Sequence, residues 1–204
     1  MSKGCVYIVD DDFAMRDSLE MLLASQDYET KLFRDGNEFL QAAPFLPFGV
    51  VVVDLQMPGM DGLEMLDRLK ARKISFPVVV ITGFGNITVA VKAMRAGAID
   101  FVEKPFSEKT ILASMELAFA SPNALSEGDI KREVVQRLTR LSRREHEVMT
   151  RLVAGNSNKV AALNLGLSPR TVEIHRARVM EKMQARSLSE LVRLAIAAGI
   201  NPDC

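Results

Sequence analysis

Five short apolar runs recur along the first 120 residues, and stretches with helical spacing separate them. The runs are Val6–Val9, Glu29–Phe33, Val50–Val53, Val78–Ile81 and Phe101–Glu103. The stretches that follow them predict helices at Phe13–Ser25, Gly36–Ala43, Gly62–Ala71, Asn86–Ala96 and Glu108–Phe119. Strands that alternate with helices predict an α/β unit, a parallel sheet wound with helices.

The last 60 residues have helix start and stop signals but no strand-like run. Ser142 with Glu145, and Ser187 with Glu190, have the spacing of capping boxes, and Ser168 precedes a proline at the first helical position. Glycines follow three of the apolar stretches, at Gly155, Gly166 and Gly199. These signals predict an all-α unit of four helices.

A third pattern joins the two parts. Ser121-Pro122-Asn123 ends the last helix of the first part, and Ile130, Val134, Leu138 and Leu141 then recur at helical spacing. This apolar stripe would pack on the second domain or pair two chains. The predicted domains are therefore residues 1–121 and 141–204, with a largely helical linker at 122–140.

Charge separates the same two parts. Residues 1–120 contain 12 Lys and Arg against 17 Asp and Glu, a net charge of −5, whereas residues 121–204 contain 14 against 9, a net charge of +5. The basic part indicates a nucleic-acid partner, although ordinary surface variation gives such splits too. Cys5 and Cys204 have no zinc or disulfide spacing, and no apolar run reaches the roughly 20 residues of a membrane helix. We expect a cytoplasmic protein without a membrane partner.

Polar residues of reactive types follow four of the five apolar runs. They are Asp10 and Asp11, Asp54, Thr82, and Lys104. Carboxyl ends of parallel strands share one edge of the sheet, so these side chains should converge there. Clustered carboxylates repel and hold either a cation or a proton, and Mg²⁺ prefers oxygen ligands. Taken singly, each residue also fits a solvated turn, a turn cap or an inert edge.

The first 120 residues resemble a CheY-like receiver domain, on these five positions together with the loop Met57–Gly62 and the ending Lys104-Pro105-Phe106. The resemblance implies the sheet order 2-1-3-4-5, which is the strand order of the CheY fold. It implies phosphorylation at Asp54 by a histidine kinase, with Thr82 and Lys104 assisting and Thr82 and Phe101 acting as a switch. It also implies a Mg²⁺ cofactor, whose ligands would be Asp10 (through water), Asp11, Asp54 and the carbonyl of Gln56. Asp12 receives no role.

Two further hypotheses concern the first part. An apolar residue flanked by opposite charges, Val91 with Arg95 and Asp100, suggests a self-complementary face for a homodimer that forms on phosphorylation. An Asp-x-Asp after a strand is also typical of haloacid-dehalogenase phosphatases, which have Thr or Val two positions later, where this chain has Ala14.

The segment from Leu141 to Gly199 resembles a LuxR/NarL-type helix-turn-helix domain, most specifically over Leu167–Met183. One face of the helix in that segment is apolar, and Ile174 stands among charges on the opposite face. Such a helix fits the major groove, where Ile174 would touch a thymine methyl group and Glu173 would accept from cytosine. The candidate DNA-binding residues are Asn158, Lys159, Arg170, Thr171, Glu173, Ile174, His175, Ala177, Arg178 and Lys182.

The order of the domains resembles a response regulator of the NarL/FixJ family, in the nitrogen-fixation branch of that family. The resemblance implies a sensor histidine kinase, promoter DNA and RNA polymerase as partners, and transcription activated by phosphorylation. It implies no enzyme activity beyond phosphoryl transfer to Asp54 and its hydrolysis. Two alternatives remain: a Mg²⁺-dependent phosphohydrolase, and a receiver adaptor whose four-helix module binds protein rather than DNA.

Overall fold

The structure, a computed structural model, describes residues 2–83, 87–120 and 134–200 of the chain. The described residues form two compact units, the first made of residues 2–83 and 96–120 and the second of residues 87–95 and 134–200. This division differs from the predicted boundary at residue 121, because residues 87–95 group with the second unit. The domain boundaries predicted at residues 121 and 141 therefore stay predictions.

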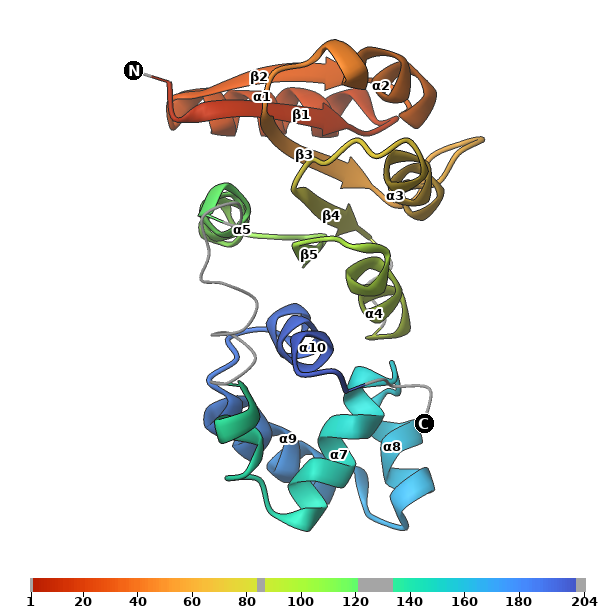
Figure 1. Ribbon diagram of the computed structural model, residues 1–204, viewed down its shortest axis with the longest axis vertical. Coiled ribbons are helices and arrows are strands. Elements are labelled where there is room, and N and C mark those ends of the chain that lie inside the picture. The colour runs from red at the N-terminus through yellow and green to blue at the C-terminus, as the bar shows by residue number, and fades with distance from the viewer. Residues whose placement is uncertain (1, 84–86, 121–133, 201–204) are drawn as a thin grey trace. The chain divides into compact units, whose positions relative to one another are not determined.

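The predicted strands and helices of the first 120 residues are present, with ends shifted by a few residues at most (Figure 1). The strands are β1 (Gly4–Val9), β2 (Tyr28–Phe33), β3 (Gly49–Asp54), β4 (Val78–Thr82) and β5 (Asp100–Glu103). The helices are α1 (Phe13–Ser25), α2 (Gly36–Ala42), α3 (Gly62–Ala71), α4 (Ile87–Ala96) and α5 (Glu108–Ala120), and a 3₁₀ turn at Ala43–Phe45 follows α2.

The five strands form one parallel sheet in the predicted order β2-β1-β3-β4-β5. β3 lies at its centre with all six residues buried, which explains why this strand is a continuous apolar run rather than an alternating one. β1 pairs with β3 so that Val9 lies opposite Val53. The residue that follows each of these partners is an aspartate, so the pairing brings Asp10 and Asp54 to the same edge.

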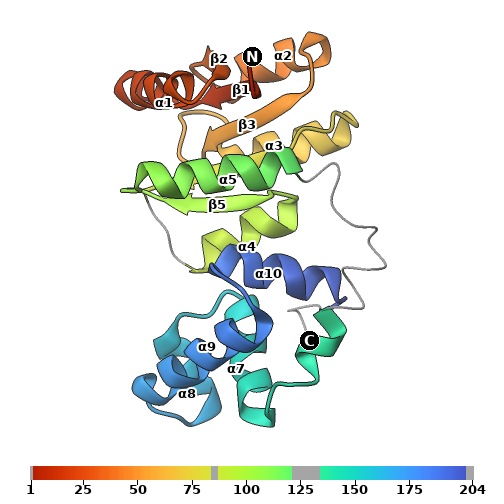
Figure 2. The ribbon, with the colours of Figure 1, turned by 90° about the vertical axis from the view of Figure 1, so that its left-hand side faces the viewer.

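Helices cover both faces of the sheet. On one face, α1 and α5 cover the sheet (Figure 2), and their buried side chains pack against the even-numbered side chains of β1 and β3. The helical residues in this contact are Leu19, Leu23, Ile111, Met115 and Ala118. On the other face, Tyr7 of β1 packs against the rings of Phe33, Phe39 and Phe76. Because β1 and β3 are held from both sides, their carboxyl ends form a fixed base for the site.

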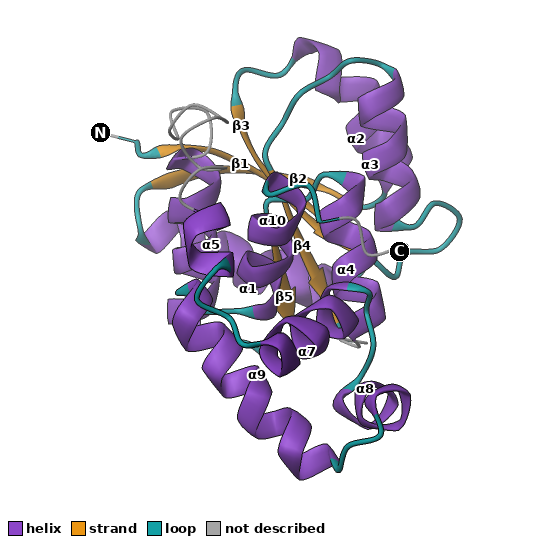
Figure 3. Cartoon of the chain, turned by 60° about the horizontal axis from the view of Figure 1, so that its bottom comes forward, coloured by secondary structure: helices purple, strands orange, loops and turns teal. Residues whose placement is uncertain are grey.

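The second unit contains the four predicted helices (Figure 3): α7 (Arg143–Val153), α8 (Asn158–Leu165), α9 (Pro169–Met183) and α10 (Leu188–Ala197). A serine side chain caps the start of each one, at Ser142, Ser157, Ser168 and Ser187. The capping box of Ser142 and Glu145 is confirmed. The one predicted at Ser187 is wrong in part, because the Glu190 carboxylate accepts from the Arg186 backbone N–H instead.

The described end of the predicted linker belongs to the second unit. Residues 134–138 are helical, Val134 is buried, and Arg137 donates from Nη1 to the Met183 carbonyl at 2.9 Å. Ile130, the first residue of the predicted apolar stripe, lies outside the described residues. Across the parts of the chain that the structure describes, no helix is long and apolar enough to span a membrane.

Candidate functional site

Three carboxylates meet at the carboxyl edge of the sheet, as the sequence predicted. One oxygen from each of Asp10, Asp11 and Asp54 lies within 4.8 Å of the other two. Asp10 and Asp54 are buried, with 2% and 8% of their surface exposed, whereas Asp11 is exposed. Like charges at this separation repel, so the cluster favours a cation or a proton among its oxygens.

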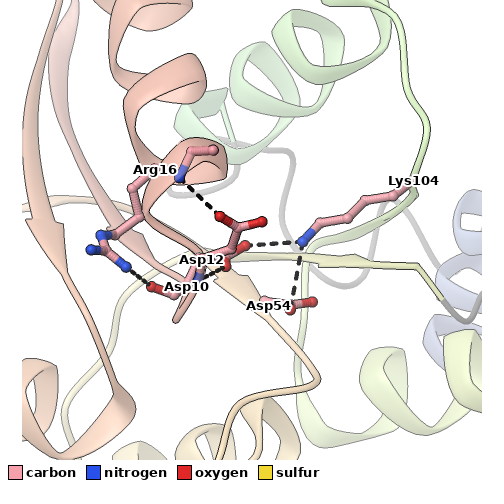
Figure 4. A network of polar contacts seen from close by, with 6 residues as sticks. Asp10, Asp12, Arg16, Asp54 and Lys104 are labelled. Carbon is pink, nitrogen blue, oxygen red and sulfur yellow. Dashed lines mark hydrogen bonds and ion pairs between the residues drawn. The ribbon is translucent and has the colours of Figure 1, made fainter.

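The ammonium group of Lys104 reaches the same cluster from the loop after β5 (Figure 4). Its Nζ lies 3.0 Å from Asp10 Oδ2 and 3.5 Å from Asp54 Oδ2, and its side chain is 19% exposed. The bond between Lys104 and Pro105 is cis. One positive charge therefore faces two buried negative ones, and the cluster keeps a net negative charge.

One carboxylate oxygen of Asp54 has no hydrogen-bond donor among the described atoms. This oxygen, Oδ1, is buried. Burial raises the pKa of the Asp54 carboxyl; the Lys104 ammonium opposes this shift and the Asp10 carboxylate adds to it. A buried oxygen without a partner is costly, and a hard cation prefers an oxygen donor set of this kind. These carboxylates therefore fit a divalent cation.

The remaining receiver residues lie where the predicted sheet places them. Thr82 ends β4 beside β3 and is 1% exposed, and Phe101 in β5 is half-buried. The side chain of Gln56 is exposed. The predicted ligand role of the Gln56 carbonyl and the switch roles of Thr82 and Phe101 stay predictions.

Three residues near the cluster make contacts that the sequence did not predict. Asp12, which had no predicted role, caps α1 by accepting from the Ala14 backbone N–H at 2.8 Å. Arg16 donates from Nη1 to the Asp10 carbonyl at 2.6 Å and so holds the β1–α1 loop (Figure 4). A Cβ on Gly62 would lie 2.6 Å from the Asp54 carbonyl oxygen, so α3 begins against the backbone of the site.

The residues of the predicted dimer face do not form an exposed group here. Val91 is 3% exposed, so its side chain is not available at the surface. The Asp100 carboxylate accepts from the Ser114 hydroxyl at 2.7 Å and from the Phe101 backbone N–H at 2.9 Å, and it is thus engaged within the chain. Only Arg95 is exposed as predicted, and the dimer face stays a prediction.

The second unit presents the predicted outward face on α9. Val172, Val179 and Met183 are fully buried, and the side chains on the opposite face are exposed: Arg170, Glu173, Ile174, Ala177 and Arg178. Ile174 is 47% exposed among these charges. α8 precedes α9 across a turn in which Gly166 has a φ of +64°, a helix–turn–helix arrangement (Figure 3).

The other predicted DNA-binding residues differ in their surroundings. Lys159 is exposed; the Asn158 amide accepts from Arg176, and the Thr171 hydroxyl lies 2.8 Å from the Ser168 hydroxyl. His175 is half-buried, and its Nδ1 has no partner among the described atoms. Lys182 departs from the prediction, because its ammonium is bonded to the buried Glu145 carboxylate at 2.6 Å instead of projecting from the exposed face.

Two family models match the chain, one in each part. Residues 6–116 match the response regulator receiver domain, and residues 139–195 match the luxR family of bacterial regulatory proteins. The first match covers the acidic cluster with Lys104, and the second covers all four helices of the second unit from α7 to most of α10.

Relatives with the same two parts match over their whole length. The transcriptional regulatory protein FixJ of Bradyrhizobium diazoefficiens is 50% identical over 204 residues, which cover 99% of each chain. FixJ of Rhizobium meliloti is 44% identical over all of both chains. Among solved structures, full-length FixJ from B. japonicum has a TM-score of 0.59 at 50% identity and covers 98% of this chain and 100% of that one.

Proposed function

Because the chain belongs to the NarL/FixJ family of response regulators, we propose that Asp54 accepts a phosphoryl group and thereby controls DNA binding by α9. The two domains make the chain a phosphorylation-controlled transcriptional regulator rather than a classical enzyme, with a sensor kinase and promoter DNA as partners. The observation that carries the assignment to Asp54 is its buried Oδ1, to which no described atom donates a hydrogen bond. This oxygen lies in a cluster of acids beside Lys104.

The proposed reaction forms one bond and breaks another. An Asp54 oxygen attacks the phosphorus of a phosphohistidine on the kinase, and the P–N bond breaks with its electron pair left on the imidazole nitrogen. Lys104 offsets the charge on the transferring oxygens, and the Thr82 hydroxyl donates to the phosphoryl group afterwards. When bound, Mg²⁺ would supply further positive charge. Asp10, Asp11, Asp54 and the carbonyl of Gln56 would hold it, Asp10 through water.

Labelling the purified chain with acetyl phosphate and Mg²⁺ tests this assignment. The wild-type chain should gain one phosphoryl group per molecule by intact mass. Asp54→Asn should gain none, and the control Asp67→Asn, which changes an exposed acid on α3, should be labelled like the wild type. Labelling of Asp54→Asn to the same extent would refute the assignment, and continuous release of phosphate from small esters would favour the phosphohydrolase alternative.

The exposed face of α9 is the proposed DNA-binding surface. Ile174 and Ala177 would contact bases, Arg170 and Arg178 would contact phosphates, and Lys159 would add a contact from α8. Binding should weaken steeply with salt, because each neutralised phosphate releases counterions. DNA selected from a random pool, with and without acetyl phosphate and Mg²⁺, tests the proposal; recovery of no preferred sequence in either arm would favour the adaptor alternative.

The remaining partners extend the proposal. Phosphorylated chains would form a homodimer that occupies two half-sites about one helical turn apart and activates RNA polymerase. The proposed DNA target supports a cytoplasmic location, and the likeness to FixJ supports a part in controlling nitrogen-fixation genes. Light scattering of the chain before and after labelling tests dimerisation, and an unchanged molar mass would refute it.

A further inference from the structure

A buried charged side chain lies in the second unit, away from the exposed face of α9. Glu145, in the first turn of α7, is 3% exposed and is the one buried charged side chain among the described residues of that unit. Its Oε2 accepts from the Ser142 backbone N–H at 2.7 Å and from the Lys182 ammonium at 2.6 Å. A buried carboxylate is tolerated when its oxygens are bonded, and the partners of Glu145 come from two different helices.

The ion pair joins opposite ends of two helices. Glu145 lies at the N-terminus of α7, where a helix dipole favours negative charge, and Lys182 lies in the last turn of α9, where it favours positive charge. Arg137 binds the same turn of α9 through the Met183 carbonyl. The C-terminal turn of α9 is thus fastened to α7 and to the preceding helical segment.

The fastened turn lies at one end of the helix that carries the exposed DNA-binding face. Twelve residues separate Lys182 from Arg170, which at 1.5 Å per residue is about 18 Å along α9. A tilt of roughly 5° at the fastened end would displace the other end by about 1.6 Å over that length. A hydrogen bond to a base edge tolerates far less than this displacement, because its length varies by only a few tenths of an ångström.

We propose that Glu145 and Lys182 are positioning residues for DNA binding, and that Lys182 acts through Glu145 rather than on a DNA phosphate. The inference rests on the DNA-binding function proposed for α9, and it replaces the DNA contact that the sequence suggested for Lys182. The two roles differ in what they change. A phosphate contact contributes equally to every DNA sequence and to the salt dependence, whereas helix position affects chiefly the preference between sequences.

The test uses the full chain with acetyl phosphate and Mg²⁺, and two DNA duplexes. One duplex is selected by the wild-type chain from a random pool, and the other is a scrambled duplex of the same base composition. Affinity for each is measured over a salt series, at a temperature where circular dichroism shows each variant folded. The variants are Glu145→Gln, Lys182→Met, the double variant, Lys182→Arg and Arg178→Gln.

We expect Glu145→Gln and Lys182→Met each to lower the ratio of the two affinities about tenfold, the effect of one mismatched base pair, without changing the salt slope. The double variant should lose about as much as either single one, because the two changes remove one interaction. Lys182→Arg keeps the charge and should keep most of the ratio. Arg178→Gln, an exposed residue of the same helix, should weaken both duplexes and lower the slope by about one.

The possible contrary results distinguish an error in this inference from an error in the proposed DNA-binding function. If Lys182→Met weakens both duplexes equally and lowers the slope by about one, Lys182 is a phosphate contact and the inference is overturned. An unchanged ratio in a folded Glu145→Gln variant overturns it as well. Equal binding of the two duplexes by the wild-type chain would overturn the proposed DNA-binding function itself, and this inference with it.

Discussion

Replacing Asp54 by asparagine should stabilise the metal-free chain, although it removes the proposed phosphorylation site. The charged Asp54 carboxylate lies within 4.8 Å of two other carboxylates, and a pair at that distance repels by about 3.5 kcal/mol at an effective dielectric near 20. Lys104 at 3.5 Å attracts it by about 4.7 kcal/mol on the same basis. Asp11 is exposed, so water and salt screen its share of the repulsion.

The balance disfavours the charge on Asp54, because burial adds to the repulsion. We take the net cost as about 1–2 kcal/mol, which corresponds to a rise in Tm of roughly 3–8 °C for a unit of this size. The sign of the pH dependence follows from the raised pKa of Asp54. Well below 3.8, the ordinary pKa of an aspartate, both states are protonated and the variant has no advantage. The advantage grows as the pH rises from that value to the raised folded pKa, and it is complete above the folded pKa.

The measurement is the thermal unfolding of the receiver unit within the full chain, in EDTA, between pH 3 and pH 7. Asp67→Asn removes an exposed negative charge from the same unit and is the matched control, for which we expect no change. At neutral pH, adding Mg²⁺ to 100 times its Kd should stabilise the wild type by about 2.7 kcal/mol and the Asp54→Asn chain by less. A variant less stable than the wild type in EDTA at pH 7 would refute the argument that the acids repel in the folded chain.

Three more predictions follow from single contacts. Gly62→Ala should cost about 1–3 kcal/mol in urea unfolding, because its Cβ would lie 2.6 Å from the Asp54 carbonyl; an unchanged midpoint would show that α3 shifts freely. Ile174→Ser should reduce affinity for a selected duplex about fivefold or more while leaving the salt slope unchanged, as measured by fluorescence anisotropy. Glu145 has a pKa lowered to about 2, chiefly by the Lys182 hydrogen bond, so its contribution is present above pH 4.5 and lost as pH falls toward 2. The difference in Tm between wild type and Glu145→Gln should narrow over that window, and a constant difference would contradict the ion pair.

The fold and the acidic cluster were predictable because they depend on local patterns and one rule of topology. Apolar runs separated by helical spacing indicated the five strand–helix units, and serine caps indicated the starts of three of the last four helices. The convergence of Asp10, Asp54 and Lys104 followed because the carboxyl ends of parallel strands share an edge. These predictions needed no knowledge of how any single side chain is oriented.

The surroundings of Val91, Asp100 and Lys182 depend on side-chain contacts between elements, which the sequence patterns do not specify. Whether Val91 is exposed cannot be read from its charged neighbours, because a helix in an α/β unit has both kinds of face. Asp100 bonds Ser114, fourteen residues away on α5, and Lys182 bonds Glu145, thirty-seven residues earlier on α7. Helical spacing places Lys182 on α9 but does not tell which neighbouring helix reaches it. The capping-box motif identified Glu145 as a cap and left its second partner unseen.

The proposed acceptor Asp54, its ammonium partner Lys104 and the second buried acid Asp10 lie at the end of β3, just after β5 and just after β1, and these carboxyl ends share one edge only in the finished sheet. During synthesis the ribosome releases the acceptor well before the lysine, so an emerging or truncated chain that ends before β5 lacks the assembled pocket. On the proposed mechanism, such a chain lacks the Lys104 ammonium that would offset the charge on the transferring oxygens.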